Sequence, residues 1–220
     1  MAVMWALIHK LGSPPWFYRI SGSAIRWLLP LTVTFLLLGL VWGLLFAPPD
    51  FKQGNSYRII YVHVPSAVVA LAGYYVMALA GAVSLIWRIK MADLTMRAAA
   101  PVGAVLTAIA LATGAIWGKP TWGTWWVWDA RITSMLILLF LYLGVMALFE
   151  SFENKTAAAK ACAVLSLIGT VNIPIIYKSV DWWYSLHQPA SIKFTGETSI
   201  DSSMLYPLLI MIIAFYLLFA

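Results

Sequence analysis

Six long stretches without a charged residue constrain this chain more than any other feature of its sequence. They cover residues 27–49, 59–87, 98–118, 132–149, 161–177 and 202–220. A helix of roughly 20 apolar residues is long enough to cross the hydrocarbon core of a bilayer. A helix also satisfies its own backbone hydrogen bonds, which lipid cannot do. The sequence therefore predicts an all-α polytopic membrane protein, a bundle of six transmembrane helices.

Composition supports this fold class. The chain is 63% hydrophobic and only 10% charged, which excludes a water-soluble globule and a disordered chain. The loops are too short for an extramembrane domain, so residues 1–220 are expected to form one domain. We expect the first run to be retained as a span, because it is too long for a cleaved signal peptide. The lipid bilayer is therefore an expected partner of this protein.

The charged residues and the single cysteine exclude several classes of function. The net charge of +6 does not indicate nucleic-acid binding, because the 14 Lys and Arg residues are dispersed at loop ends. Cys162 lies in a predicted span, and the chain has no CxxC or CxxCH pattern. A disulfide framework, a cysteine zinc site and covalent attachment of c-type haem are therefore excluded.

The distribution of Lys and Arg indicates the orientation. The N-terminus and the 88–97 and 150–160 loops hold eight of these residues, whereas the 50–58, 117–131 and 178–201 loops hold six. Loops richer in Lys and Arg usually face the cytoplasm. We therefore expect both termini in the cytoplasm and the second set of loops on the outer face.

A dense tryptophan cluster, here called the tryptophan segment, occupies residues 117–131 and reads WGKPTWGTWWVWDAR. It holds five of the twelve tryptophans: Trp117, Trp122, Trp125, Trp126 and Trp128. If the segment is helical, an i, i+3, i+4, i+7 spacing gives an aromatic shelf on one face, made of Trp122, Trp125, Trp126 and Asp129. The alternative is an interfacial aromatic belt, but a belt is spread over many helix ends.

Two of the three histidines, His63 and His187, lie in loops on the same side as the tryptophan segment. A proline follows each by two residues, at Pro65 and Pro189, and would restrict the backbone of the residue between them. Neutral imidazole binds haem iron well, so one histidine from each side could clamp a porphyrin against the tryptophans. The alternative for each is an interfacial histidine hydrogen-bonded to a backbone carbonyl.

A porphyrin also carries two propionates, which need cations or other donors when partly buried. The outer-face candidates are Arg58, Lys119, Arg131, Lys178 and Lys193. Arg131 is the most attractive because it lies two residues from Asp129. The alternative role for Arg131 is an ion pair with Asp129 at the start of the fourth span. Asp129 is also a candidate N-cap for the helix that begins there.

The tryptophan segment resembles the WWD signature of membrane proteins that present haem on the outer side of bacterial and some mitochondrial inner membranes. With two flanking histidines, six spans and a length near 220, the whole chain resembles the CcmC family, the haem-delivery protein C of the multi-component cytochrome c maturation system. The resemblance implies that His63 and His187 are axial ligands of haem iron. It also implies a haem platform made of Trp117, Trp122, Trp125, Trp126, Trp128 and Asp129.

Further properties follow from the same resemblance. The implied location is the bacterial inner membrane, with the haem site on the periplasmic face and haem b as a transient cargo. The implied partners are a periplasmic haem chaperone with a single membrane anchor, an ABC-type ATPase, its membrane subunit, and a small single-span protein.

The function expected from these features is to bind haem on the outer face and transfer it to the chaperone. The chain shows no nucleophile, acid–base pair or phosphate loop, so we expect no enzymatic activity and assign ATP hydrolysis to a partner. A transporter moving haem across the bilayer is one alternative, but it predicts ionisable residues at mid-span. A membrane haem-b electron carrier is the other, but it would need ligating histidines inside the spans.

Overall fold

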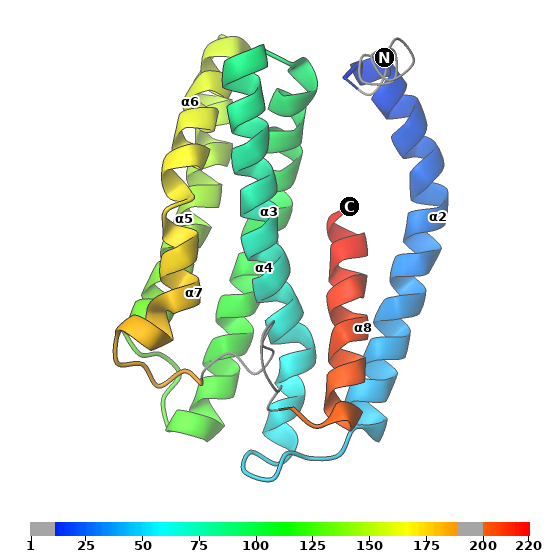
Figure 1. Cartoon of the computed structure of the whole chain (residues 1–220), viewed down its shortest axis with the longest axis vertical. Coiled ribbons are helices and arrows are strands. Elements are labelled where there is room, and N and C mark those ends of the chain that lie inside the picture. The colour runs from blue at the N-terminus through cyan, green and yellow to red at the C-terminus, as the bar shows by residue number, and fades with distance from the viewer. Residues whose placement is uncertain (1–11, 189–199) are drawn as a thin grey trace.

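The structure, a computed structural model, describes residues 12–188 and 200–220 (Figure 1). The long helices are α2 (Pro14–Val41), α3 (Ile60–Trp87), α4 (Lys90–Trp122), α5 (Ala130–Ser151), α6 (Lys155–Gly169), α7 (Asn172–Trp182) and α8 (Ser202–Phe219). A π-helix, Trp42–Phe46, continues α2, and a 3-10 helix, Asn55–Ile59, leads into α3. The described residues contain no β-strand beyond an isolated bridge.

Six segments are long and apolar enough to cross a membrane, which confirms the predicted bundle. They are Pro14–Phe46, Asn55–Trp87, Lys90–Trp122, Ala130–Ser151, Lys155–Trp182 and Ser202–Phe219. The third begins at Lys90 rather than at residue 98, and it ends inside the tryptophan segment. Helical hydrogen bonding does not require apolar side chains, so α4 continues past the limits of its uncharged run.

The fifth span is divided in two by Thr170 and Val171, which separate α6 from α7. Pro174 lies just beyond this break. It has no N–H to donate to the carbonyl of Thr170, and its ring crowds that carbonyl. The helix of this span is therefore interrupted close to Pro174.

The helices pack as a compact group, formed by α3 to α7, with α8 and α2 added at one side (Figure 1). In the group, α3 packs on α4 and α6, and α5 packs on α4, α6 and α7. Two fully buried tyrosines, Tyr74 and Tyr142, meet edge to face with ring centroids 5.1 Å apart. Gly103 makes room for this contact, because a Cβ atom there would lie 2.1 Å from Cζ of Tyr142.

Small polar side chains inside the spans are satisfied by the helices themselves. The Thr107 hydroxyl donates to the carbonyl of Gly103 at 2.7 Å, and the Asn172 amide donates to the carbonyl of Ser134 at 2.8 Å. Thr107 thus bonds within α4, whereas Asn172 links α7 to α5.

Three connecting segments lie at the same end of the bundle, drawn at the bottom of Figure 1. They comprise residues 47–54, 123–129 and 183–188 and follow the π-helix, α4 and α7. This end, here called the loop end, carries His63, the tryptophan segment and His187. His9 and Lys193 lie outside the described residues.

Candidate functional site

The tryptophan segment is helical only in its first half. Helix α4 ends at Trp122, and Gly123 adopts a left-handed conformation with φ 79°. Glycine adopts this conformation without strain, which makes it a common helix terminator. Residues 124–129 then run without regular helix until α5 begins at Ala130. The predicted shared helical face of Trp122, Trp125, Trp126 and Asp129 is therefore wrong.

The five tryptophans fall into two groups instead. Trp117 and Trp122 lie on the last turns of α4 and are half-buried. Beyond Gly123, Trp125 and Trp128 are exposed, with fractional exposures of 57% and 75%. Trp126 packs edge to face on Trp128, with ring centroids 5.4 Å apart. The buried Nε1 of Trp126 has no hydrogen-bond partner in residues 12–188 and 200–220.

His63 lies in the first turn of α3, and its imidazole faces α4. Its Nδ1 atom is 3.0 Å from the carbonyl oxygen of Ala110 and 3.1 Å from the hydroxyl of Thr113. The ring also meets Trp117 edge to face at 5.7 Å. Gly114 leaves space for this imidazole, because a Cβ atom there would lie 3.0 Å from its Cε1.

The proline after His63 does not act as predicted. Val64 is helical rather than extended, and Pro65 lies within α3. Helices packed in a membrane accommodate proline because neighbouring groups satisfy the freed carbonyl. The hydrogen bonds to α4 therefore orient the His63 imidazole, and the restricted backbone does not. Pro189, the proline after His187, lies outside the described residues.

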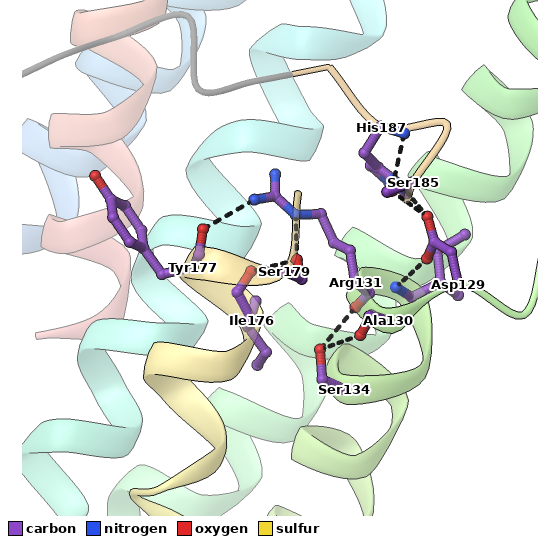
Figure 2. Close-up of polar contacts among 10 residues, drawn as sticks. Asp129, Ala130, Arg131, Ser134, Ile176, Tyr177, Ser179, Ser185 and His187 are labelled. Carbon is purple, nitrogen blue, oxygen red and sulfur yellow. Dashed lines mark hydrogen bonds and ion pairs between the residues drawn. The ribbon is translucent and has the colours of Figure 1, made fainter. Parts of the chain in front are cut away.

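His187 lies on the 183–188 connection, and its imidazole faces Asp129 at the start of α5 (Figure 2). Its Nδ1 atom is 3.1 Å from Oδ2 of Asp129. The Ser185 hydroxyl donates to the same oxygen and accepts from the backbone N–H of His187 at 3.1 Å. Trp122 packs against the imidazole with ring centroids 4.7 Å apart.

Asp129 is the N-cap of α5, as predicted: its Oδ1 accepts from the N–H of Ile132 at 2.8 Å. Burial raises the pKa of Asp129, but the hydrogen bonds from Ser185, Ile132 and His187 outweigh it and leave that pKa below its ordinary value. Burial lowers the pKa of His187 below its ordinary value, against the opposing effect of Asp129. The carboxylate is therefore ionised and the imidazole neutral near neutral pH.

Both histidines use Nδ1 for an internal hydrogen bond. A carbonyl and a carboxylate can only accept, so Nδ1 carries the hydrogen in each neutral ring. The lone pair then resides on Nε2, which makes no hydrogen bond to the described residues. Both imidazoles lie at the loop end of the bundle. This arrangement leaves two nitrogen donors available at one site.

Arg131 joins α5 to the end of α7. Its Nε donates to the Ser179 hydroxyl at 3.1 Å and its Nη2 to the carbonyl of Tyr177 at 3.2 Å (Figure 2). Within the described residues Arg131 forms no close ion pair with Asp129, so that alternative is wrong. Arg131 instead fixes the position of the segment that leads to His187.

The other outer-face cations are engaged to different degrees. Arg58 donates from Nη2 to the carbonyl of Ala47 at 2.9 Å, while its buried Nε has no partner among residues 12–188 and 200–220. Lys119 donates to the carbonyl of Gly123 at 3.1 Å, and Lys178 pairs with Asp181 at 3.0 Å. Of these, Arg58 retains an unsatisfied donor.

A hollow of about 410 Å³ opens at the loop end, between the start of the 3-10 helix, the last turn of α4 and the end of the 183–188 connection. It is lined by Lys52, Gln53, Ser56, Pro120, Thr121, Trp122 and Gln188. Trp122 lines the hollow and also packs against His187. Gln53 accepts from Nε1 of Trp117 at 2.6 Å, which connects the hollow to the His63 side.

The sequence assigned no role to several residues that orient the site, among them Ser185, Gln53, Thr113 and Ala110. The sequence contained a local signal for Ser185, because a serine hydroxyl often accepts from the backbone N–H two residues later, here that of His187. The others contact their partners across 47 to 64 positions of sequence. No local pattern marks such contacts.

Comparison with known proteins identifies the family. The family model described as "Heme exporter protein C" matches residues 7–220. The chain belongs to the Heme exporter protein C family. It is 52% identical over 217 residues to the "Heme exporter protein C" of Escherichia coli (strain K12), covering 99% of this chain and 87% of that protein.

Other members of the family are similar over almost the same length. The protein from Haemophilus influenzae is 50% identical over 216 residues, covering 98% of this chain and 88% of that protein. The protein from Bradyrhizobium diazoefficiens is 48% identical over 209 residues, covering 95% and 79%. The family resemblance inferred from the tryptophan segment and the histidines is therefore confirmed.

Proposed function

We propose that this chain binds haem b between His63 and His187 on the periplasmic face of the inner membrane and hands it to a haem chaperone during cytochrome c maturation. The printed name of its relatives, "Heme exporter protein C", supports haem as the cargo. One observation carries the assignment of ligands. Two imidazoles from separate segments lie at the loop end, each with Nδ1 bonded internally and Nε2 available.

The surroundings of the two histidines suit a porphyrin. Trp117 and Trp122 each pack against one histidine, so an aromatic wall stands beside each ligand. The exposed rings of Trp125 and Trp128 offer further apolar surface for the macrocycle. These residues, with Trp126, form the platform that we propose, although not as one helical face.

Buried donors without a partner provide candidate contacts for the propionates. Nε of Arg58 and Nε1 of Trp126 have no acceptor among the described residues, and a buried unpaired donor is costly. A carboxylate of the cargo would satisfy either of them. Arg131 is a further candidate, because only Nε and Nη2 of its guanidinium are bonded to the described residues. Asp129 acts on the haem indirectly, through His187.

The role is delivery rather than catalysis. The chain holds haem as cargo, and ATP hydrolysis belongs to an ABC-type ATPase that acts with its membrane subunit and a small single-span protein. The excess of Lys and Arg on the other side of the membrane supports cytoplasmic termini and a periplasmic loop end. The haem chaperone, held by a single anchor, would approach the loop end from the periplasm.

Visible absorption spectra test this proposal. The full chain is purified from membranes as wild type, His63→Ala and His187→Ala, with His9→Ala as the control histidine. We expect a low-spin haem spectrum for wild type and His9→Ala, and a shifted spectrum with less haem for each of the other two. Added imidazole should restore the low-spin spectrum, because it supplies the missing nitrogen.

Two results would contradict the proposal. An unchanged spectrum in both His63→Ala and His187→Ala would show that neither histidine binds the iron. A wild-type protein that never carries haem, either alone or with the chaperone, would refute haem delivery itself.

A further inference from the structure

We propose that the two axial ligands are unequal, with Asp129 and Ser185 acting as positioning residues that make His187 the stronger donor to haem iron. The inference rests on the proposed function, because it concerns how that site holds its cargo. It comes from the different partners of the two Nδ1 atoms, a carboxylate group for His187 and a carbonyl and a hydroxyl for His63.

On the His187 side, the partner of Nδ1 is the carboxylate group of Asp129. The exposed fractions of the His187 and Asp129 side chains are only 16% and 7%, so water screens the contact poorly. A carboxylate that accepts from Nδ1–H draws the proton toward itself and raises the electron density on Nε2. His187 is therefore a strong, anion-assisted ligand.

The Asp129 carboxylate is itself held in place. Its Oδ1 caps α5 through Ile132, and its Oδ2 accepts from Ser185 as well as from His187. Ser185 in turn accepts from the N–H of His187, which closes a small ring of hydrogen bonds. The ring ties a ligand on an irregular connection to the rigid start of a membrane span.

On the His63 side, the partners of Nδ1 are neutral. They are the carbonyl of Ala110 and the hydroxyl of Thr113, whose own proton is donated to the carbonyl of Ile109 at 2.6 Å. Within the described residues no carboxylate contacts this imidazole. A neutral acceptor polarises the ring less than a carboxylate does. His63 is therefore the weaker donor.

This difference predicts which of the two iron–histidine bonds breaks first when haem is released. The iron–Nε2 bond to His63 breaks first, and its electron pair stays on the His63 nitrogen. A lone-pair donor from the acceptor protein then forms the new bond to iron with its own electron pair. The oxidation state of iron does not change in this exchange, and His187 retains the haem until the new bond has formed.

The test compares carboxylates at two helix N-caps in the haem-loaded full chain. Asp129→Asn removes the charge beside His187 and keeps the cap of α5, because asparagine caps helices about as well as aspartate. Asp201→Asn is the matched control. Asp201 caps α8 and accepts from Ser203, as Asp129 accepts from Ser185, but it contacts no histidine among the described residues.

Two measurements follow for each variant: the midpoint potential of the haem, and the rate of haem loss to excess apomyoglobin. For Asp129→Asn we expect a higher potential and haem loss faster by about ten- to a hundredfold, the usual effect of removing a partner of a metal-ligating histidine. Asp201→Asn should match wild type. Thr113→Val should change the potential less than Asp129→Asn does.

Ser185→Ala provides a second variant should Asp129→Asn fail to accumulate. It is expected to shift the potential in the same direction by a smaller amount, because the carboxylate stays but loses its orientation. A His63→Gly protein should also retain haem longer than a His187→Gly protein.

The outcomes separate the two proposals. The first outcome is that Asp129→Asn and Ser185→Ala both show the wild-type potential, rate of haem loss and low-spin spectrum. It would refute the proposal that His187 is the stronger donor, but not the proposal that the chain binds haem. An unchanged spectrum in both His63→Ala and His187→Ala would instead refute the assignment of the two histidines as ligands, and with it any difference in their donor strength.

Discussion

The two ends of the bundle use polar residues in different ways. At the end opposite the loop end, the ion pair between Arg97 and Glu150 joins α4 to α5, but the two side chains are 55% and 70% exposed. At the loop end, Arg131 is half-buried and bonds to two groups of α7, and Asp129 is almost fully buried against His187. Exposed pairs are screened by water, so the Arg97–Glu150 pair fixes the positions of its side chains less firmly than the contacts of Arg131 and Asp129 do.

The contrast between the two ends predicts that substituting Arg131 destabilises the protein more than substituting Arg97 does. Arg131→Met removes the hydrogen bonds to Ser179 and Tyr177 but retains most of the length of the side chain. We expect the free energy of unfolding to fall by roughly 2–3 kcal/mol, because two charged hydrogen bonds between α5 and α7 are lost, one of them to the buried Ser179. The measurement is reversible unfolding of the purified protein in detergent, followed by tryptophan fluorescence.

Arg97→Met is the matched control at the other end. An exposed ion pair contributes about 0.2–1 kcal/mol, so this variant should remain close to wild type. Equal destabilisation by the two substitutions would show that the ends do not differ as the exposed fractions indicate.

Two glycine-to-alanine substitutions, each of which adds one methyl group, test the same comparison through haem binding. A Cβ atom on Gly114 would lie 3.0 Å from Cε1 of His63, whereas a Cβ atom on Gly22 would meet no other atom within 4 Å. Gly114→Ala should therefore displace the imidazole and weaken haem binding, by roughly 1–2 kcal/mol if it resembles other overpacked sites. Gly22→Ala should leave haem binding unchanged. Titration of the haem-free proteins with haemin measures the difference.

A Gly114→Ala protein that binds haemin as tightly as wild type would contradict this expectation. It would show either that His63 can shift without losing the iron or that His63 is not a ligand. The spectrum of His63→Ala distinguishes these two explanations.

The sequence predicted the parts of this fold that depend on local chemistry. The uncharged runs mark the six spans, because lipid excludes charged and unpaired groups. The side of each loop follows from the order of the spans, so His63, the tryptophan segment and His187 were correctly brought to one end. Asp129 was a predicted helix cap, since aspartate before an apolar run accepts from the first free N–H groups.

The sequence did not predict features that depend on contacts between distant segments. The pairing of Asp129 with His187 joins residues 58 positions apart and depends on how α5 packs on α7. Local signals also conflicted. Gly123 could be read as a point of close approach on a continuous helix, but its left-handed conformation ends α4 instead. Pro65 indicated an extended Val64, but packing around α3 keeps this residue helical.

The smallest expected effect concerns two exposed tryptophans. Trp128 at the loop end is 75% exposed, and Trp87 at the other end is 64% exposed. Trp128→Ala should weaken haem binding by about 0.5–1.5 kcal/mol, the range for one aromatic contact, if its ring is part of the platform. Trp87→Ala should not change haem binding. Haemin titrations of the two variants and wild type provide the comparison.

These two variants separate a platform from an aromatic belt. An interfacial tryptophan contributes to membrane anchoring at either end, so a belt predicts that both substitutions have the same small effect on stability and none on haem. A platform predicts a loss of haem affinity for Trp128→Ala alone, because only the loop end holds the two histidines. Equal haem affinity in both variants would therefore assign Trp128 to the belt, and the proposed platform would be limited to tryptophans nearer the ligands, such as Trp117 and Trp122.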